Sequence, residues 1–177
     1  MSAVARTKQA VGNVAVQQSQ YLTFVLGGET FAIAVVGIKE IVPYINLTAV
    51  PMMPNFIRGV INLRGSVVPV VDLAARFGQG TSTMTKRTCI VIIEVGINDE
   101  KQDIGMMVDA VSAVLDVASD QIEPAPAFGA RIRTDFISGM AKVGGKFVII
   151  LNIDYVLSVE EMTLVAGVRR ESVSGVS

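Results

Sequence analysis

The sequence has no histidine, no tryptophan and only one cysteine among its 177 residues. Without an imidazole there is no Ser-His-Asp triad, no Cys-His pair and no HExxH zinc motif. The single Cys89 cannot form an internal disulfide, and it lies in the apolar run 89–93, where a thiol packs as a small hydrophobic side chain. These absences exclude most hydrolase chemistry. Carboxylate-pair, Lys-based and phosphate-loop chemistry remain open, and each requires its own sequence signature.

An excess of charge of one sign is also missing. Fifteen basic side chains balance sixteen acidic ones, and only 6% of the residues are aromatic. A nucleic-acid-binding protein needs a basic surface that displaces counterions from phosphates, so nucleic acid is not an expected partner.

Long hydrophobic runs are absent as well. No segment reaches the roughly 18 apolar residues that a transmembrane helix requires, because Arg64, Asp72, Glu94 and Lys146 interrupt the candidates. The apolar stretch near the N-terminus is broken by Gly12 and Asn13 and is interpreted as a tail rather than a signal peptide. We therefore predict a cytoplasmic protein without direct membrane insertion.

What the sequence does have is a series of short Val- and Ile-rich runs separated by Gly, Asn and Pro, a pattern typical of strands joined by tight turns. Residues 21–26 are followed by Gly27-Gly28 and a returning run at 30–35, which predicts a β-hairpin. Residues 88–95 and 104–108 have the same form. The pattern predicts an all-β fold.

An internal repeat supports a duplicated β-unit. The segment Phe56–Val60 recurs as Phe136–Met140, a shift of 80 positions that continues through residues 70–73 and 150–153. Upstream, Ile33 to Ile41 match Met106 to Val114 at a shift of 73. We predict two small five-stranded β-barrels packed side by side, with short helices including one near the C-terminus.

The predicted organisation is a single domain, in which strands can be exchanged between two subdomains. Ser158 and Glu161 form a capping box that predicts the C-terminal helix. The boundaries are a flexible tail at 1–19, the first barrel at 20–78, a linker at 79–87, the second barrel at 88–157, the helix at 158–166 and a flexible tail at 167–177.

Two features resemble catalytic or binding motifs but have a structural interpretation, and a third indicates protein contact. Gly144-Gly145-Lys146 lacks the spacing of a phosphate-binding loop and predicts a hairpin turn. Asp72, Asp109 and Asp154 each follow a strand and are expected to terminate it. Surplus apolar residues at 35–42 and 108–115 indicate exposed patches for protein contact.

Arg64 stands at a turn apex. From spacing alone it is either a solvated surface residue or a member of an oriented ion pair.

The chain resembles the CheW family, the coupling proteins of bacterial chemotaxis. The resemblance is carried by Val50-Pro51 and the run 54–73, PNFIRGVINLRGSVVPVVDL. It extends through 108–115, VDAVSAVL, the turn 122–126 and the segment 136–153. It covers residues 20 to about 164.

The resemblance implies two SH3-like β-barrels and a non-enzymatic adaptor with no catalytic residue, no metal site and no cofactor. Such an adaptor couples the cytoplasmic hairpin tips of chemoreceptors to the histidine kinase CheA, through the regulatory domain of that kinase. It assigns Ile38, Glu40 and Arg64 to receptor coupling. Val111 and Val114 are assigned to further partner binding.

We further hypothesise that a groove between the barrels takes a receptor helix, and that Glu40 and Arg64 pair across the first barrel. Two alternatives remain open: a double barrel that binds a small ligand, and a regulatory domain belonging to a larger kinase.

Overall fold

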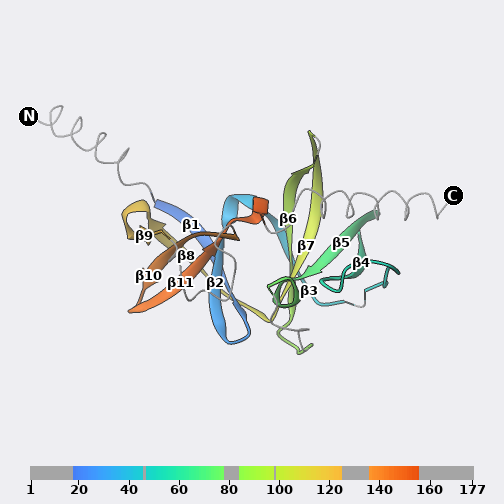
Figure 1. Cartoon of the computed structure of the whole chain (residues 1–177), viewed down its shortest axis with the longest axis horizontal. Helices are drawn as coiled ribbons and strands as arrows, with labels where there is room; N and C mark the ends of the chain where they lie inside the picture. The colour runs from blue at the N-terminus through green and yellow to red at the C-terminus, as the bar shows by residue number, and fades with distance from the viewer. Residues whose placement is uncertain (1–17, 46, 78–83, 98, 125–135, 156–177) are drawn as a thin grey trace, which may run out of the picture.

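The computed structural model describes residues 18–45, 47–77, 84–97, 99–124 and 136–155, which form two lobes lying side by side (Figure 1). The expected C-terminal helix, the expected tail at 167–177 and residues 79–83 of the expected linker lie outside these residues. Residues 1–17 of the expected N-terminal tail also lie outside them, whereas Gln18 and Ser19 of that expected tail begin the first strand. The elements are β1 (Gln18–Leu26), β2 (Glu29–Ala34), η1 (Val35–Gly37), β3 (Ile38–Pro43), β4 (Ile57–Leu63), β5 (Ser66–Asp72), α2 (Leu73–Arg76), β6 (Cys89–Ile97), β7 (Glu100–Val108), β8 (Ala110–Ala118), η2 (Ser119–Gln121), β9 (Ile122–Glu123), β10 (Ile137–Val143), β11 (Lys146–Leu151) and η4 (Ile153–Tyr155).

Each lobe is one mainly antiparallel sheet. The six-stranded lobe has the order β8-β1-β2-β11-β10-β9, and the five-stranded lobe has the order β3-β6-β7-β5-β4. The predicted all-β fold of two subdomains is confirmed. One lobe has six strands rather than five, because the 3-10 turn η2 separates β8 from the two-residue strand β9 that pairs with β10.

The lobes do not follow the sequential halves of the chain. The hairpin β1–β2, from the first half, completes the sheet of β8 to β11, whereas the hairpin β6–β7, from the second half, completes the sheet of β3 to β5. The two additions are equivalent, since β2 runs parallel to β11 and β7 runs parallel to β5. Each barrel expected from consecutive residues therefore exchanges its first hairpin with the other.

The strand registers confirm the predicted repeat. Ile57 pairs with Val71 in the five-stranded lobe, and Ile137 pairs with Leu151 in the six-stranded lobe, each beside a bulge. The N–H of Asp72 donates to the carbonyl of Phe56 at 2.7 Å, and the N–H of Asn152 donates to that of Phe136 at 2.8 Å. The shift of 80 positions therefore relates equivalent backbone positions in the two lobes.

Three apolar clusters hold the molecule together. The largest lies between the sheets and takes side chains from both, whereas a smaller cluster fills the inside of each lobe. The central cluster includes Phe24, Phe31, Ile33, Val71, Val91, Ile93 and Met106. The five-stranded lobe contains Ile61, Val68, Val70, Ile90, Ile92 and Met107, and the six-stranded lobe contains Ala32, Val117, Ala141, Val148 and Ile150. Because the central cluster is shared, the lobes are held at a fixed spacing.

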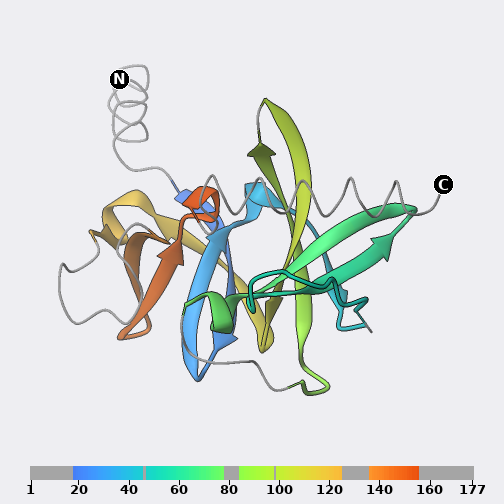
Figure 2. The same ribbon diagram turned by 45° about the vertical axis from the view of Figure 1, so that its right-hand side comes forward.

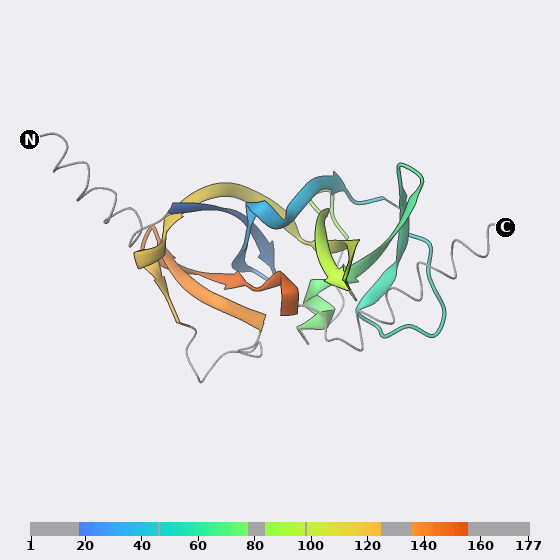
Figure 3. The ribbon, with the colours of Figure 1, turned by 90° about the horizontal axis from the view of Figure 1, so that it is seen from above.

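Two equivalent short helices, α2 and η4, lie between the lobes (Figure 3). The guanidinium of Arg76 in α2 lies 5.1 Å from the ring centroid of Phe56 and 4.7 Å from that of Phe136, the two aromatic residues related by the repeat.

The β6–β7 hairpin extends above the other strands of the molecule (Figure 2).

Two of the aspartates have the structural roles expected of them. Asp72 is the N-cap of α2 and accepts a bond from the N–H of Ala75 at 3.3 Å, and Asp109 accepts one from the N–H of Gly27 at 2.9 Å. Beside Asp154 it is Asn152 whose side chain forms the turn, accepting from the backbone N–H of Asp154 at 3.1 Å. Gly144 and Gly145 have φ angles of 58° and 80°, which confirms a hairpin turn rather than a phosphate loop.

Candidate partner-binding surface

The five residues assigned to partner binding fall into two groups. Ile38 and Glu40 lie on β3, and Glu40 forms an ion pair with Arg64 in the β4–β5 turn, so these three belong to the five-stranded lobe. Val111 and Val114 lie on β8 in the six-stranded lobe. The predicted pairing of Glu40 with Arg64 is confirmed, whereas the partners of all five residues stay a prediction.

A β-bulge decides which way Glu40 points. Ile38 pairs with Ile93 and Glu40 pairs with Ile92, so Lys39 is an extra residue on β3. Ile93 faces the central cluster, whereas Ile92 faces the inside of the five-stranded lobe. The bulge therefore shifts the alternation of β3, and Glu40 turns toward the mouth of this lobe instead of following Ile38 onto the central cluster.

Arg64 has a backbone conformation that residues other than glycine rarely adopt. It occupies the left-handed region with φ 52°, next to Gly65 with φ 85°, in a two-residue hairpin closed by the pair Leu63–Ser66. Its guanidinium meets both carboxylate oxygens of Glu40, one of them with Nη2 to Oε2 at 3.0 Å. This bond raises the pKa of Arg64 above its usual value.

The ion pair also has a topological role. β3 and β4 stand at opposite ends of the strand order of the five-stranded lobe, and Glu40 and Arg64 connect β3 to the turn that follows β4. The pair therefore draws the two ends of the curled sheet together.

A second charged group lies beside the first. Glu94 on β6 and Asp103 on β7 are directly opposite each other in the register, an arrangement that is unfavourable for like charges. The ammonium of Lys39 lies 3.1 Å and 3.2 Å from the two carboxylate oxygens of Asp103 and 3.7 Å from Glu94, whose other oxygen lies 3.7 Å from the ammonium of Lys101. The bond to Asp103 raises the pKa of Lys39, because it favours the charged ammonium.

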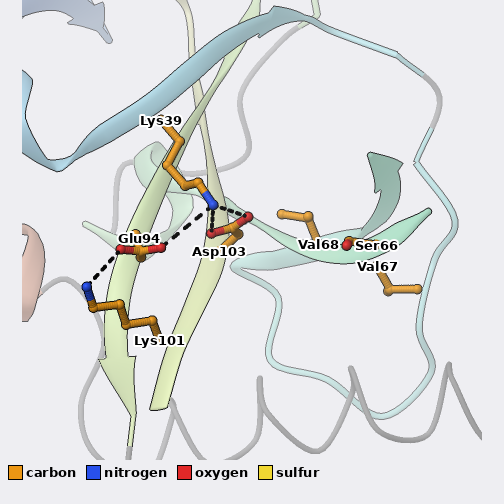
Figure 4. A pocket seen from close by; sticks show the side chains of 7 residues that line it. All are labelled: Lys39, Ser66, Val67, Val68, Glu94, Lys101 and Asp103. Carbon is orange, nitrogen blue, oxygen red and sulfur yellow. Dashed lines mark hydrogen bonds and ion pairs between the residues drawn. The ribbon is translucent and has the colours of Figure 1, made fainter. Parts of the chain in front are cut away.

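These side chains line a small pocket of about 170 Å³, whose other wall is formed by residues 66–68 at the start of β5 (Figure 4). The pocket lies at the mouth of the five-stranded lobe, whose interior is filled by its apolar cluster. Sequence reasoning missed Lys39, Glu94, Lys101 and Asp103. They meet only because the hairpin of one repeat pairs with the strands of the other.

The six-stranded lobe serves as an internal comparison for these charges. The repeat and the strand registers place an uncharged residue at each equivalent position, although the backbone has the same bulge and the same hairpin turn. The equivalents of Lys39, Glu40, Arg64, Glu94 and Asp103 are Ser112, Ala113, Gly144, Val25 and Thr30. The fold therefore does not require the charged array, which distinguishes one lobe from the other.

Apolar side chains on both lobes complete the surface. Ile41 on β3 is 42% exposed, and its equivalent Val114 on β8 is 53% exposed. Ile38 and Val111 are instead half-buried and pack against the central cluster, so they contribute to a surface only through their outer atoms. Sequence reasoning missed Ile41 as an outward residue because the bulge that changes the alternation of β3 leaves no local signal.

Both of these strands stand at sheet edges. β3 pairs with β6 and β8 pairs with β1, and each is the first strand in its sheet order.

Across the ranges that the structure describes, no three His, Cys, Asp or Glu side chains gather in the way that would hold a metal ion. Within the same ranges, no helix is long and apolar enough to cross a membrane.

Comparisons with known proteins agree with this architecture. The CheW-like domain family matches residues 20–161. The chemotaxis protein CheW of Klebsiella aerogenes is 34% identical over 170 residues, which cover 96% of this chain and 99% of that protein. The chemotaxis protein CheW of Thermotoga maritima is 29% identical over 157 residues, covering 87% and 96% of the two chains. The crystal structure of the scaffolding protein TtCheW from Thermoanaerobacter tengcongensis superimposes with a TM-score of 0.73 at 34% identity, covering 82% of this chain and 91% of that one.

Proposed function

The chain belongs to the CheW-like family, and we propose that it is a non-enzymatic adaptor coupling the cytoplasmic tips of chemoreceptors to the histidine kinase CheA. Its place in the cell is then the cytoplasm, at arrays of membrane-bound receptors. The proposal follows from family membership together with the surface described above.

The observation that carries the proposal is the difference between two lobes of one fold. The five-stranded lobe presents Arg64 and Glu40 beside the exposed Ile41. The equivalent positions of the six-stranded lobe hold the uncharged residues Gly144 and Ala113 beside the exposed Val114. Two unlike surfaces held at a fixed spacing suit a protein that holds two unlike partners. In this arrangement, the receptor helix contacts the Arg64 side and the regulatory domain of the kinase contacts an end of a lobe.

The chemistry of the surface favours a protein partner over a small ligand. The side chain of Arg64 is 75% exposed. A carboxylate or carbonyl oxygen on a receptor helix can accept hydrogen bonds from the guanidinium N–H groups that Glu40 does not use. Nearby apolar side chains supply the water-excluding contact around such an anchor. The insides of both lobes are filled by side chains, which opposes a ligand-binding barrel. Single contacts of this size give modest affinity, and arrays increase it through multivalency.

The proposal is tested by titrating the chain with a soluble receptor signalling fragment and, separately, with the regulatory domain of CheA. We expect saturable binding of both. Arg64→Ala and Glu40→Ala should each weaken receptor binding at least about tenfold, a loss typical of an interface hot spot. The melting curve measured by circular dichroism should stay unchanged in both variants.

The matched control is Lys146→Ala in the six-stranded hairpin, which should leave receptor binding unchanged. Absence of binding to both partners would contradict the proposed function. Unaltered receptor binding in both variants would remove the ion pair from the mechanism.

A further inference from the structure

We infer that Lys39 and Asp103 are positioning residues for partner binding: they hold the β3 bulge against the β6–β7 hairpin and thereby fix where Glu40 presents Arg64. The inference rests on the proposed function in taking the receptor as the partner of Arg64. It adds a second ion pair, beside the pair of Glu40 and Arg64, to the site.

In the six-stranded lobe, side-chain hydrogen bonds connect the equivalent bulge to the neighbouring strand. There, the hydroxyl of Thr23 on β1 donates to the carbonyl of Ala113 at 3.1 Å and accepts from the N–H of Ala113 at 3.1 Å. Ala113 is the equivalent of Glu40, and these two bonds tie the bulged strand β8 to its neighbour. A bulge leaves backbone groups outside the ladder, so a side chain that bonds them stabilises it.

The five-stranded lobe has no such threonine. The position equivalent to Thr23 is Ile92, which pairs with Glu40 and whose side chain has no hydrogen-bonding group. Among the side-chain bonds of the described residues, those that join β3 to the β6–β7 hairpin come from Lys39, to Asp103 and to Glu94. The two lobes therefore stabilise the same bulge by different interactions. In the six-stranded lobe a threonine hydroxyl bonds to the backbone of the bulged strand, whereas in the five-stranded lobe Lys39 forms a salt bridge with Asp103 (Figure 4).

The salt bridge of Lys39 affects the orientation of Arg64 because Lys39 directly precedes Glu40 in the chain. Lys39 is the bulged residue and Glu40 follows it directly, so a displacement of Lys39 moves the carboxylate that orients the guanidinium. The side chain of Glu40 is 26% exposed and that of Arg64 is 75% exposed, so the more buried carboxylate sets the direction of the guanidinium. Without the ammonium of Lys39, the opposed carboxylates of Glu94 and Asp103 repel each other at the point where β3 is attached.

Binding measurements provide the first test. Lys39→Met and Asp103→Asn break the same contact from opposite sides, and each should weaken binding of the receptor signalling fragment about 3- to 10-fold, the range of a mutation that acts through a neighbouring group. Lys39→Arg should restore wild-type binding. Lys101→Met is the matched control, because it removes the same charge beside Glu94 without touching β3, and it should change binding less than about twofold.

A double-mutant cycle separates positioning from a direct contact or a loss of fold. In the Arg64→Ala background, Lys39→Met should produce no further loss, because its effect passes through Arg64. An equal loss in both backgrounds, or wild-type binding by both Lys39→Met and Asp103→Asn, would overturn the inference.

A partner-free measurement keeps the inference testable if the receptor does not bind. In NMR spectra, the Arg64 guanidinium of the wild type should show slow rotation of its Nη groups, because both groups donate hydrogen bonds to the carboxylate of Glu40. Rotation should become fast in Lys39→Met and Asp103→Asn and stay slow in Lys101→Met. Unchanged rotation in the first two variants would contradict the positioning role, whereas a wild type that fails to bind the receptor fragment would contradict only the proposed function.

Discussion

Truncation of Phe31 tests whether the two lobes unfold as one unit. Phe31 lies on β2 of the six-stranded lobe with no exposed surface, 6.1 Å from the ring of Phe24 and 6.0 Å from that of Phe77, measured between centroids. Phe31→Ala leaves a cavity in the central cluster and should lower the free energy of unfolding by about 3–5 kcal/mol. In a chain of this size, that corresponds to a melting temperature lower by about 6–20 °C.

The assay is native-state hydrogen exchange, which reports the opening free energy of individual amides. Since the central cluster joins both sheets, the slowest amides of β7 and of β11 should lose the same protection, and calorimetry should show a single transition. The control is Val148→Ala in the smaller cluster of the six-stranded lobe, expected to cost about 2 kcal/mol. Loss of protection confined to the six-stranded lobe, or two separate transitions in Phe31→Ala, would refute the shared core and with it the fixed spacing of the two surfaces.

Three further predictions concern the turn, the charges and a glycine. Arg64→Gly places in the five-stranded lobe the residue that Gly144 provides in the other, so the melting temperature should stay level or rise while receptor binding is lost; a lower melting temperature would show that the fold needs Arg64. Because the pKa of Lys39 is raised, its contribution to stability is present below its ordinary value of 10.5 and is lost only as the pH rises above the folded value. The chain has no histidine, so melting temperatures should be constant between about pH 5.5 and about pH 7, and a decrease inside that window would reveal an unassigned titrating group. Gly59→Ala should cost at least twice the roughly 1 kcal/mol expected of Gly28→Ala in chemical denaturation. A Cβ at Gly59, with φ 149°, would clash with the carbonyl oxygen of Thr48, whereas a Cβ at Gly28, with φ 84°, would enter open space; equal costs would refute the clash.

The hairpins and the repeat were predictable because their signals are local. Gly27-Gly28 and Gly144-Gly145 both mark turns with positive φ, and the alternation of Val and Ile on either side marks strands. The shift of 80 positions then identified equivalent residues before any register was known.

The exchange of hairpins was allowed by the sequence but not specified by it. The apolar pattern of β1–β2 suits either sheet, since both lobes present the same face to an added hairpin. In the folded chain, the central cluster brings Phe31 of β2 against Phe77, the C-cap residue of α2, which is far from it in the sequence.

The same limit applies to the site. Glu40 and Arg64 were found through a family resemblance and by their charges, but the bulge at Lys39 reverses the alternation of β3 without any local signal. Asp103 reaches Lys39 only through the exchanged hairpin, so no spacing along the chain connects these two residues.

The central claim, that one chain joins two unlike partners, is tested most directly by analytical ultracentrifugation of the chain with the receptor signalling fragment and the regulatory domain of CheA together. The account predicts a complex containing all three components, which loses the receptor fragment but keeps the kinase domain when Arg64 is replaced by alanine. Mutually exclusive binding, in which either partner displaces the other from the wild-type chain, would contradict it.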